Sequence, residues 1–273
     1  MNVLLLGDVI GSKGCEAIIS RLPALKKALE VDFVVVNAEN AAEGFGLSPE
    51  IAEKLFDAGV DVLTLGNHTF ACRSILRIID IETRIVRPLN IARESPGFGA
   101  QMFSCNNSGA RVFVLSALGR VFMQPSYDDP FKMVDDQLKD VNLAQDADVI
   151  ILDFHCETTS EKMAMAHWCD GRVSIVVGTH THVPTADTRI LPGGTAYQTD
   201  LGMCGDYNSV IGMDAEEPVS RFVTGINRQR FKPAKGAVTV SGLFVRIDTS
   251  TGFAVEAFPV RTGGSLSETG VCK

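Results

Sequence analysis

The sequence contains no long apolar run, no excess of basic residues and few aromatic residues. Its 273 residues carry a net charge of −8. That charge argues against broad binding of DNA or RNA, which needs clustered lysine and arginine. No apolar run approaches the roughly 20 residues that a membrane-spanning helix needs. The N-terminal residues have no basic region and reach Asp8 too early for a signal peptide. We therefore expect a soluble, cytoplasmic protein that binds neither DNA nor a membrane.

Cysteine is present, but not in a pattern that forms structural sites. The seven cysteines are odd in number and show no CxxC spacing, which disfavours a disulfide framework and a cysteine-type zinc site. Reduced thiols of a cytoplasmic protein are the simpler interpretation. The sequence also lacks internal repeats and low-complexity linkers. We therefore predict one domain over residues 1–261 and a flexible C-terminal tail over residues 262–273, which is rich in Gly and Ser.

The first third of the chain alternates between short apolar runs and helical spacing. Residues 3–6 are a continuous apolar run, and residues 32–36 and 60–65 are mostly apolar, so all three are short enough for buried strands. Residues 17–29 carry apolar side chains at helical spacing. Ser48-Pro49 opens a second helix that runs to about residue 57, because serine caps a helix and proline fits its first turn. This alternation predicts parallel strands with helices on the faces of the sheet.

The rest of the chain is less regular, with a loop expected from 118 to 130. A capping box, Thr158-Thr159-Ser160-Glu161, predicts the start of one helix. The fold class that we expect is α/β, with mixed β-sheets flanked by helices in layers. The further strands expected are 111–117, 149–152, 173–177, 237–247 and 252–260, and the further helices are 131–144, 158–168 and 215–226.

Polar motifs follow five of the expected strands and contain four of the five histidines. Ligands bind at the carboxyl ends of strands in open α/β sheets. Each motif alone has an ordinary structural explanation, since an Asp often caps a turn and a lone His is often structural. Their joint occurrence favours a two-metal site of a phosphoester hydrolase. The motifs are Gly7-Asp8, Asn37-Ala38-Glu39-Asn40, Gly66-Asn67-His68, Asp153-Phe154-His155 and Gly178-Thr179-His180-Thr181-His182.

The order of these motifs resembles the calcineurin-like metallophosphoesterases. More narrowly, the chain resembles the YmdB-type bacterial phosphodiesterases from its first residues to about 260. The longer strings that carry this resemblance are Gly7-Asp8-Val9-Ile10-Gly11, Asn37-Ala38-Glu39-Asn40-Ala41-Ala42, Gly66-Asn67-His68-Thr69, Asp153-Phe154-His155, Gly178–Asp187 and Tyr197–Gly205.

The resemblance implies roles for eight residues and a dinuclear centre of iron or manganese at the strand ends. His68 is the implied proton donor. The wider superfamily opens with Asp-x-His, but Ile10 occupies the third position here, and Asn40 is implied to supply an oxygen in its place. One metal is implied to bind Asp8, Glu39, Asn40 and His182. The other is implied to bind Glu39, Asn67, His155 and His180, with Glu39 bridging the two.

The charges of this ligand set also suit a phosphate substrate. Asp8 and Glu39 are its only carboxylates, so two divalent cations leave a positive site that attracts phosphate in an acidic protein. Together with this charge argument, the resemblance implies a phosphodiesterase that opens a 2',3'-cyclic nucleotide at the 2'-oxygen. A hydroxide activated by the two metals attacks, and His68 donates the proton. The expected partner is a small phosphodiester or cyclic nucleotide.

Alternatives from other classes stay open at this stage. One is a phosphomonoesterase or protein phosphatase, although no basic groove for a phosphoprotein is evident. Another is a regulatory binding protein whose metal site is not used for significant turnover. The resemblance also favours a homo-oligomer, although no segment defines a self-complementary patch.

Several other residues are weighed with their structural explanations. Cys156 follows His155 directly, and a small buried side chain is favoured over a reactive thiol. Phe45 lies between two glycines and could stack on a base. Arg84, Arg87 and Arg93 could bind phosphate, but their spacing equally fits an irregular, solvated segment.

Overall fold

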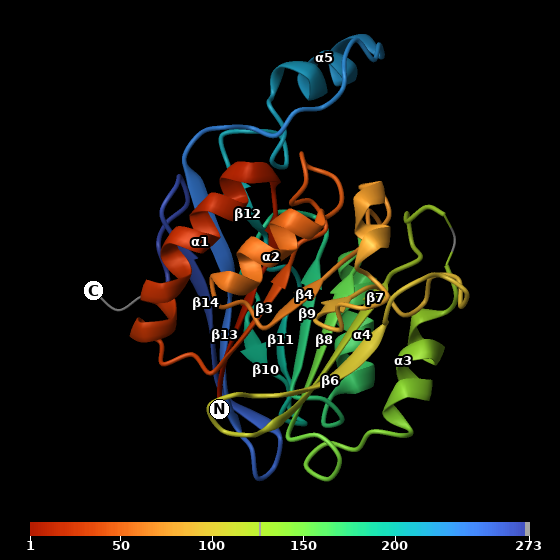
Figure 1. Cartoon of the computed structure of the whole chain (residues 1–273), viewed down its shortest axis with the longest axis vertical. Coiled ribbons are helices and arrows are strands. Elements are labelled where there is room, and N and C mark those ends of the chain that lie inside the picture. The colour runs from red at the N-terminus through yellow and green to blue at the C-terminus, as the bar shows by residue number, and fades with distance from the viewer. Residues whose placement is uncertain (126, 271–273) are drawn as a thin grey trace.

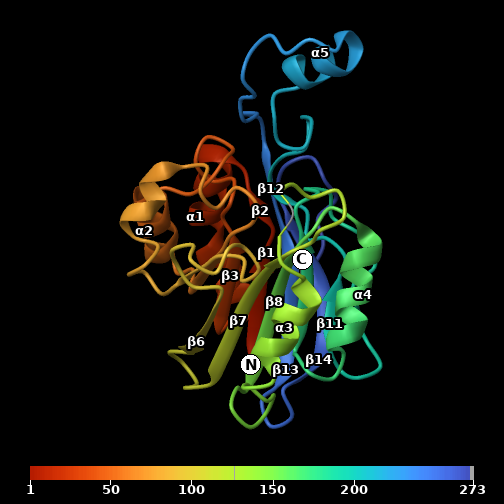
Figure 2. The same ribbon diagram turned by 90° about the vertical axis from the view of Figure 1, so that its right-hand side faces the viewer.

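The structure is a computed structural model, and it describes residues 1–125 and 127–270. Its strands form two sheets that face each other, and helices cover the outer face of each sheet (Figure 1). Seen edge-on, α1 and α2 lie on one flank and α3 and α4 on the other (Figure 2). This four-layer α/β arrangement confirms the expected fold class of mixed sheets flanked by helices.

The first sheet has eight strands, in the order β2-β12-β13-β1-β3-β4-β5, with β14 also paired to β13. β1, β3, β4 and β5 are parallel, as the alternating pattern predicts. β13 pairs antiparallel with β1 and with β14. The strands are β1 (Asn2–Leu6), β2 (Asp8–Val9), β3 (Phe33–Asn37), β4 (Val62–Thr64), β5 (Ile85–Val86), β12 (Met203–Asp206), β13 (Val238–Asp248) and β14 (Phe253–Thr262).

The second sheet has six strands, in the order β10-β11-β9-β8-β7-β6. β7, β8, β9 and β11 are parallel, and the two edge strands β6 and β10 are antiparallel to their neighbours. The strands are β6 (Ala100–Ser104), β7 (Arg111–Leu118), β8 (Val149–His155), β9 (Ile175–Thr179), β10 (Arg189–Ile190) and β11 (Ala196–Gln198).

Apolar runs form the strands because both faces of each sheet are buried. In β1, Val3 and Leu5 pack between the two sheets, whereas Leu4 and Leu6 pack against the helices outside. Because side chains alternate between the two faces of a strand, a continuous apolar run places apolar side chains on both faces of the sheet.

The helices are α1 (Gly11–Ala28), α2 (Pro49–Asp57), α3 (Pro130–Leu138), α4 (Thr159–Cys169) and α5 (Glu216–Thr224), with a 3₁₀ turn, η1 (Arg73–Arg77).

Several local predictions need correction. α1 begins at Gly11, six residues before the expected start, and α3 ends at Leu138 rather than 144. Ser48 caps α2 as predicted, since its side chain accepts a hydrogen bond from the Ile51 amide. The predicted start of α4 is confirmed, with Thr158 at the N-cap, but the capping box itself is wrong because the Thr158 side chain makes no cap hydrogen bond. Glu161 instead accepts hydrogen bonds from the amides of 120 and 121.

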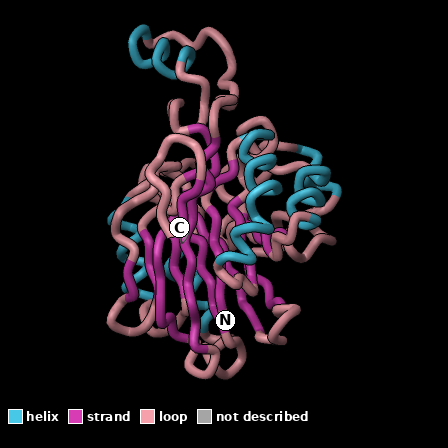
Figure 3. Tube along the Cα trace, turned by 90° about the vertical axis from the view of Figure 1, so that its left-hand side faces the viewer, coloured by secondary structure: helices cyan, strands magenta, loops and turns pink. Residues whose placement is uncertain are grey.

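One segment stands apart from the two sheets. The segment around α5 rises beyond the end of the sheets at the same end as the N-terminus of α1 (Figure 1), and a second side view shows it equally separate (Figure 3). Near the C-terminus, Thr269 forms an isolated antiparallel bridge with Arg261. Residues 271–273, which belong to the predicted flexible tail and include Cys272, lie outside the described residues. No helix in the described part of the chain is long and apolar enough to cross a membrane.

Candidate metal centre and active site

The five polar motifs meet at the carboxyl ends of the parallel strands. β3 ends at Asn37, β8 at His155 and β9 at Thr179, and Gly66 follows β4 by two residues. The two sheets are joined here by side chains, since the Asn37 amide donates to Asp153 across 2.9 Å. The structure therefore brings together all eight site residues that the sequence analysis names.

One group of potential metal ligands surrounds the Nε2 atom of His155. Glu39 Oε1 lies 3.0 Å from this nitrogen, Asn67 Oδ1 lies 2.9 Å from it, and His180 Nδ1 lies 3.0 Å from it. Glu39, His155 and His180 offer ligand atoms that lie within 4.8 Å of one another. These four residues are the set implied for one of the two metals.

A second group contains Asp8, Glu39 and His182, whose ligand atoms also lie within 4.8 Å of one another. Asp8 Oδ1 is 3.7 Å from His182 Nε2. The amide of Asn40 lies alongside, with Nδ2 at 3.2 Å from His182 Nε2 and 3.1 Å from Glu39 Oε1. Glu39 belongs to both groups, which places it between two neighbouring candidate cation sites.

Asp8 is the clearest sign that this edge suits a cation. Its carboxylate is fully buried, and Oδ1 has no hydrogen-bond partner among the described residues. Burial raises the pKa of Asp8 to about 6. A buried carboxylate oxygen without a partner carries a desolvation cost that a bound cation would offset. The donors at this edge therefore fit divalent metal ions.

The pKa values of His155, Glu39 and His180 are also shifted. Burial lowers the pKa of His155, but the carboxylate of Glu39 outweighs that effect and raises it to about 9. Burial raises the pKa of Glu39, whereas the nearby charge of His155 lowers it, and its pKa ends below the usual range. Burial, together with His155, lowers the pKa of His180 to about 3. A cation entering here would compete with protons for Glu39 and His155.

Buried hydrogen bonds fix the orientation of two of the imidazole rings. The Thr179 hydroxyl donates to Asp153 across 2.7 Å, so its oxygen is left to accept from His155 Nδ1 at 2.9 Å. His182 Nδ1 donates to the backbone carbonyl of Ile211 across 2.7 Å. In both rings Nε2 is thereby left free to face the ligand groups, which is the usual arrangement around metal-binding histidines.

A buried ion pair holds the loop between His180 and His182. Lys162 Nζ lies 2.6 Å from Asp200 Oδ2, and both side chains are almost fully buried. The same carboxylate oxygen accepts from the amide of Thr181 at 3.1 Å and from its hydroxyl at 2.7 Å. The sequence analysis missed this pair, because a lysine on a helix resembles a solvated surface charge.

The same loop adopts backbone conformations that only strong local contacts can hold. His180 and His182 have φ angles of 99° and 65°, a region that non-glycine residues rarely occupy. Gly178 precedes them, where a Cβ atom would collide with the carbonyl of Thr199. Gly66 is equally restricted, because a Cβ atom there would overlap the Glu39 carboxylate and the ring of His155. These two glycines let the strand ends approach closely.

His68 lies outside both ligand groups and faces an open cavity. Its backbone amide donates to Glu39 Oε2 at 3.1 Å, and its ring meets the edge of Phe45 at a centroid distance of 5.0 Å. The cavity measures about 460 Å³ and is also lined by Glu39, Asn40, His180 and His182. Its far wall is apolar and comes mainly from the segment around α5, with Val210, Ile211, Met213, Pro218, Phe222 and Phe231.

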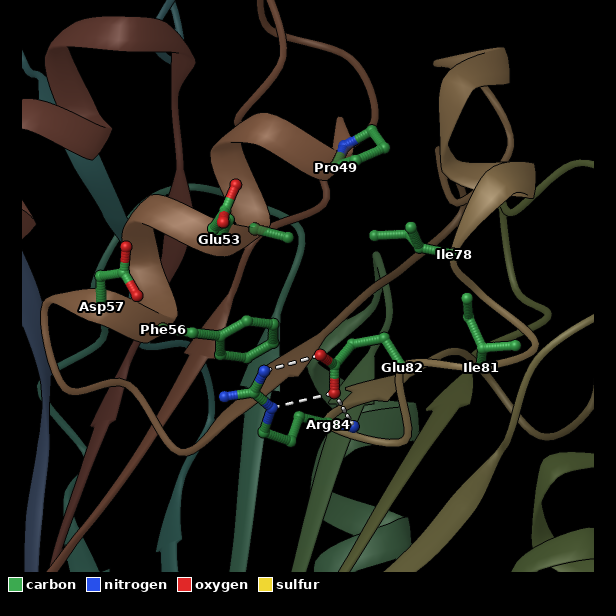
Figure 4. Close-up of a pocket in the computed structure, with 9 residues that line it drawn as sticks. Pro49, Glu53, Phe56, Asp57, Ile78, Ile81, Glu82 and Arg84 are labelled. Atoms are coloured by element: carbon green, nitrogen blue, oxygen red, sulfur yellow. Dashed lines mark hydrogen bonds and ion pairs between the residues drawn. The ribbon is translucent and has the colours of Figure 1, made fainter.

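The residues weighed as additional candidates mostly have structural roles. Arg84 pairs with Glu82 and stacks on Phe56 beside a separate cavity of about 500 Å³, which shares no lining residue with the site (Figure 4). Arg87 donates to three backbone carbonyls. Cys156 is buried, and its thiol donates to Glu161 Oε2 at 3.2 Å. Burial raises the pKa of the Cys156 thiol to about 12, so it packs as an unreactive side chain.

Known proteins resemble this chain over nearly its whole length. The model of the family described as YmdB-like protein matches residues 4–260. A 2',3'-cyclic-nucleotide 2'-phosphodiesterase of Bacillus subtilis (strain 168) is 43% identical over 256 residues, which are 94% of this chain and 95% of that protein.

Solved structures agree with these matches. A crystal structure described as a novel phosphatase of Mycoplasma pneumoniae superposes with a TM-score of 0.89 at 38% identity, covering 96% of this chain and 93% of that one. A 5'-nucleotidase of Candida albicans SC5314 superposes with a TM-score of 0.55 at 14% identity, covering 95% of this chain and 50% of that one. This second likeness concerns the fold alone. The family match and the 43% identical relative show that the chain belongs to the YmdB-like protein family, as its motifs predict.

Proposed function

We propose that this protein is a metal-dependent phosphodiesterase that hydrolyses 2',3'-cyclic nucleotides. The observation that carries the proposal is the pair of ligand groups that share Glu39 on the floor of a cavity with an apolar far wall. The name of the Bacillus subtilis relative, a 2',3'-cyclic-nucleotide 2'-phosphodiesterase, supports the same substrate class.

Asp8, Glu39, Asn40 and His182 would hold one divalent metal, and Glu39, Asn67, His155 and His180 the other. Rotating the Asn40 amide by half a turn places its oxygen where Nδ2 lies, since the two ends of an amide occupy nearly the same positions. The mixture of oxygen ligands and imidazole favours manganese or iron. When bound, such a pair of cations would supply Lewis acidity and would lower the pKa of a water molecule at the site.

The cavity offers different surfaces to the two halves of a nucleotide. His68, His180 and His182 line its polar floor, where a phosphate would lie. Phe45 and the apolar far wall would contact a nucleobase, since aromatic and apolar side chains are typical of small-molecule sites. A phosphoprotein substrate would need a longer groove than this cavity provides. The volume of about 460 Å³ suits a small phosphodiester.

His68 is the proposed proton donor. Opening the ring at the 2' position forms a bond from phosphorus to a water oxygen and breaks the bond from phosphorus to the 2'-oxygen. The 2'-oxygen takes up a proton, and the product is a 3'-phosphate. Burial lowers the pKa of His68, but an anionic phosphodiester beside the ring would raise it again and favour the protonated form. Proton donation of this kind contributes about 10²–10⁴-fold to the rate.

The proposal is tested by turnover of a defined set of phosphoesters. The protein is loaded with Mn²⁺ or Fe²⁺, and its metal content is measured. Adenosine 2',3'-cyclic phosphate, adenosine 3',5'-cyclic phosphate, bis(p-nitrophenyl) phosphate and p-nitrophenyl phosphate are then compared. We expect the 2',3'-cyclic nucleotide to react with the highest kcat/KM and to yield the 3'-phosphate. No turnover of any diester at full metal occupancy would refute the proposal.

The role of His68 is tested separately with His68→Ala. This variant should keep both metals and lose rate, with the larger loss on substrates with poor leaving groups. The control is the metal content of the variant, which should equal that of the unmodified protein. If the metal content falls instead, His68 is a ligand and its assignment as a proton donor is wrong.

A further inference from the structure

The segment around α5 is basic in an otherwise acidic chain. We call residues 210–235 the arm. The arm contains three acidic residues, Asp214, Glu216 and Glu217, and all of them precede residue 218. From residue 218 to residue 235 the sequence has no acidic residue and five basic ones, Arg221, Arg228, Arg230, Lys232 and Lys235, although the whole chain has a net charge of −8. The second part of the arm therefore concentrates positive charge beside a site that is proposed to bind phosphate.

Most of these cations are free to meet a ligand. Arg221 is engaged, because it pairs with Glu217 at 2.7 Å and lies 3.8 Å above the ring of Phe231. Arg230, Lys232 and Lys235 are exposed. None of these three makes an ion pair with any residue that the structure describes.

A small basic cavity borders the proposed active site at Phe231. It measures about 180 Å³, and its lining includes Lys13, Lys232 and Lys235, with Glu43 as the one acidic residue. Phe231 lines both this cavity and the larger one over the metal ligands. A chain of phosphates could therefore run from the metal centre past Phe231 to these lysines.

Aromatic side chains of the arm face the same path. Phe222 lines the larger cavity although 89% of its surface is exposed. Phe231 is held at the junction of the two cavities by Arg221. Basic side chains interleaved with exposed aromatic rings are the usual surface for single-stranded nucleic acid, because lysine and arginine follow the phosphates and aromatic rings stack on bases.

The base of the arm is tied to the metal centre. The amide of Asp214 donates to the Lys232 carbonyl, and the amide of Ala234 donates to the Gly212 carbonyl, each across 2.8 Å. The Ile211 carbonyl accepts from His182 Nδ1. The basic cavity and a proposed metal ligand thus share one short stretch of backbone, which fixes the distance between them.

We propose that the arm binds single-stranded RNA whose 3' end carries a 2',3'-cyclic phosphate. The terminal nucleotide occupies the larger cavity, and the phosphates that precede it lie against Lys232, Lys235 and Arg230. This inference rests on the proposed function and extends it from mononucleotides to the ends of RNA chains. DNA is excluded as a substrate, since a 2',3'-cyclic phosphate requires the ribose 2'-oxygen.

The test compares a long and a short substrate on the metal-loaded full-length protein. The substrates are uridine 2',3'-cyclic phosphate and a uridine hexamer that ends in a 2',3'-cyclic phosphate. The variant is Arg230→Gln/Lys232→Gln/Lys235→Gln, in which none of the changed residues lines the larger cavity. Lys27→Gln/Lys132→Gln/Lys139→Gln is the matched control, with the same loss of charge on exposed residues of α1, of α3 and of the position directly after α3.

We expect the unmodified protein to prefer the hexamer at least tenfold in kcat/KM at low salt. The arm variant should lose that preference, and both variants should hydrolyse the mononucleotide within twofold of the unmodified rate. The slope of log kcat/KM for the hexamer against log salt should fall by about 2 in the arm variant, since single strands give about 0.7 per neutralised phosphate. The matched control should keep both the preference and the slope.

Two results would overturn the inference while leaving the proposed function intact. One is equal kcat/KM for hexamer and mononucleotide in the unmodified protein. The other is a change of oligomeric state in the arm variant, measured by light scattering, with unchanged hexamer kinetics, which would assign the arm to contacts with a second copy. If neither substrate reacts at full metal occupancy, the proposed function fails. Fluorescence anisotropy with a labelled hexamer then decides the inference, because binding must weaken at least tenfold in the arm variant and not in the control.

Discussion

The strand ends and the arm border the same cavity but are built in opposite ways. At the strand ends, Asp8, Glu39 and His155 are buried, and hydrogen bonds from neighbouring strands fix several of the polar groups around them. On the arm, Phe222 and Val223 are 89% and 78% exposed, and α5 lies away from both sheets (Figure 1). The first region loses its geometry if one partner is removed, whereas the second can change without disturbing the core.

This difference suggests a division of labour between the two regions. Reaction chemistry requires donors held within fractions of an ångström, which packed strand ends provide. Choice of substrate requires surface that can vary, which an exposed arm provides. Substitutions at the strand ends should therefore affect metal content, rate and stability together, and substitutions of the exposed arm residues beyond its base should mainly affect substrate choice.

The largest effect is expected from Glu39→Gln. Glu39 belongs to both ligand groups, and an amide lacks the charge and the second oxygen ligand that two cations need. We expect loss of at least one metal and a fall in kcat of about 10⁴-fold or more, which equals about 5.5 kcal/mol of activation free energy. Elemental analysis and turnover of a 2',3'-cyclic nucleotide measure both quantities. Glu50→Gln, in an exposed ion pair with Arg77, is the control and should behave as the unmodified protein does.

Lys162→Met should have the next largest effect, although this side chain touches no proposed ligand. It leaves Asp200 as a buried carboxylate without its cation, which typically costs about 3–5 kcal/mol. Chemical denaturation measures the loss. Lys132→Met removes an exposed pair with Asp136 and should cost less than about 1 kcal/mol. Equal losses in the two variants would show that the buried pair does not hold the His180–His182 loop in place.

Lys162 also illustrates where sequence reasoning fails. Apolar runs revealed the main strands, and polar motifs after those strands revealed the site residues, because both signals are local. Nothing local distinguishes Lys162 from a surface lysine, since its partner Asp200 lies 38 positions away. Thr179 and Asp153 are similar, because their role in orienting His155 depends on packing between strands.

The sequence predicted the helix of the arm but neither its exposure nor its local charge. A helix over 215–226 was expected, and α5 spans Glu216–Thr224. Its apolar side chains suggested no special exposure, because periodicity shows that a helix has an apolar face but not whether another element covers that face. The charge of the arm was likewise diluted in the net charge of the whole chain.

Metal binding should stabilise the protein through the strand ends. A ligand that binds only the folded state adds about 2.7 kcal/mol at 100 times its Kd, and Asp8 Oδ1 gains a partner that it lacks among the described residues. Thermal unfolding with Mn²⁺ and with a chelator measures the difference. Asp8→Asn should remove most of the gain, and an unchanged gain in this variant would exclude Asp8 as a ligand.

The smallest effect on stability is expected from Phe222→Ala. Its ring buries little surface in the chain itself, being 89% exposed, so truncation should change the free energy of unfolding by no more than about 0.5 kcal/mol. Phe154→Ala is the matched control, because the ring of Phe154 in β8 is fully buried and its loss should cost about 3–5 kcal/mol. Denaturant titration at two protein concentrations measures both. A loss for Phe222→Ala that approaches the control and grows with protein concentration would show that the ring packs against a second copy, and the arm would then belong to the folded core of an assembly.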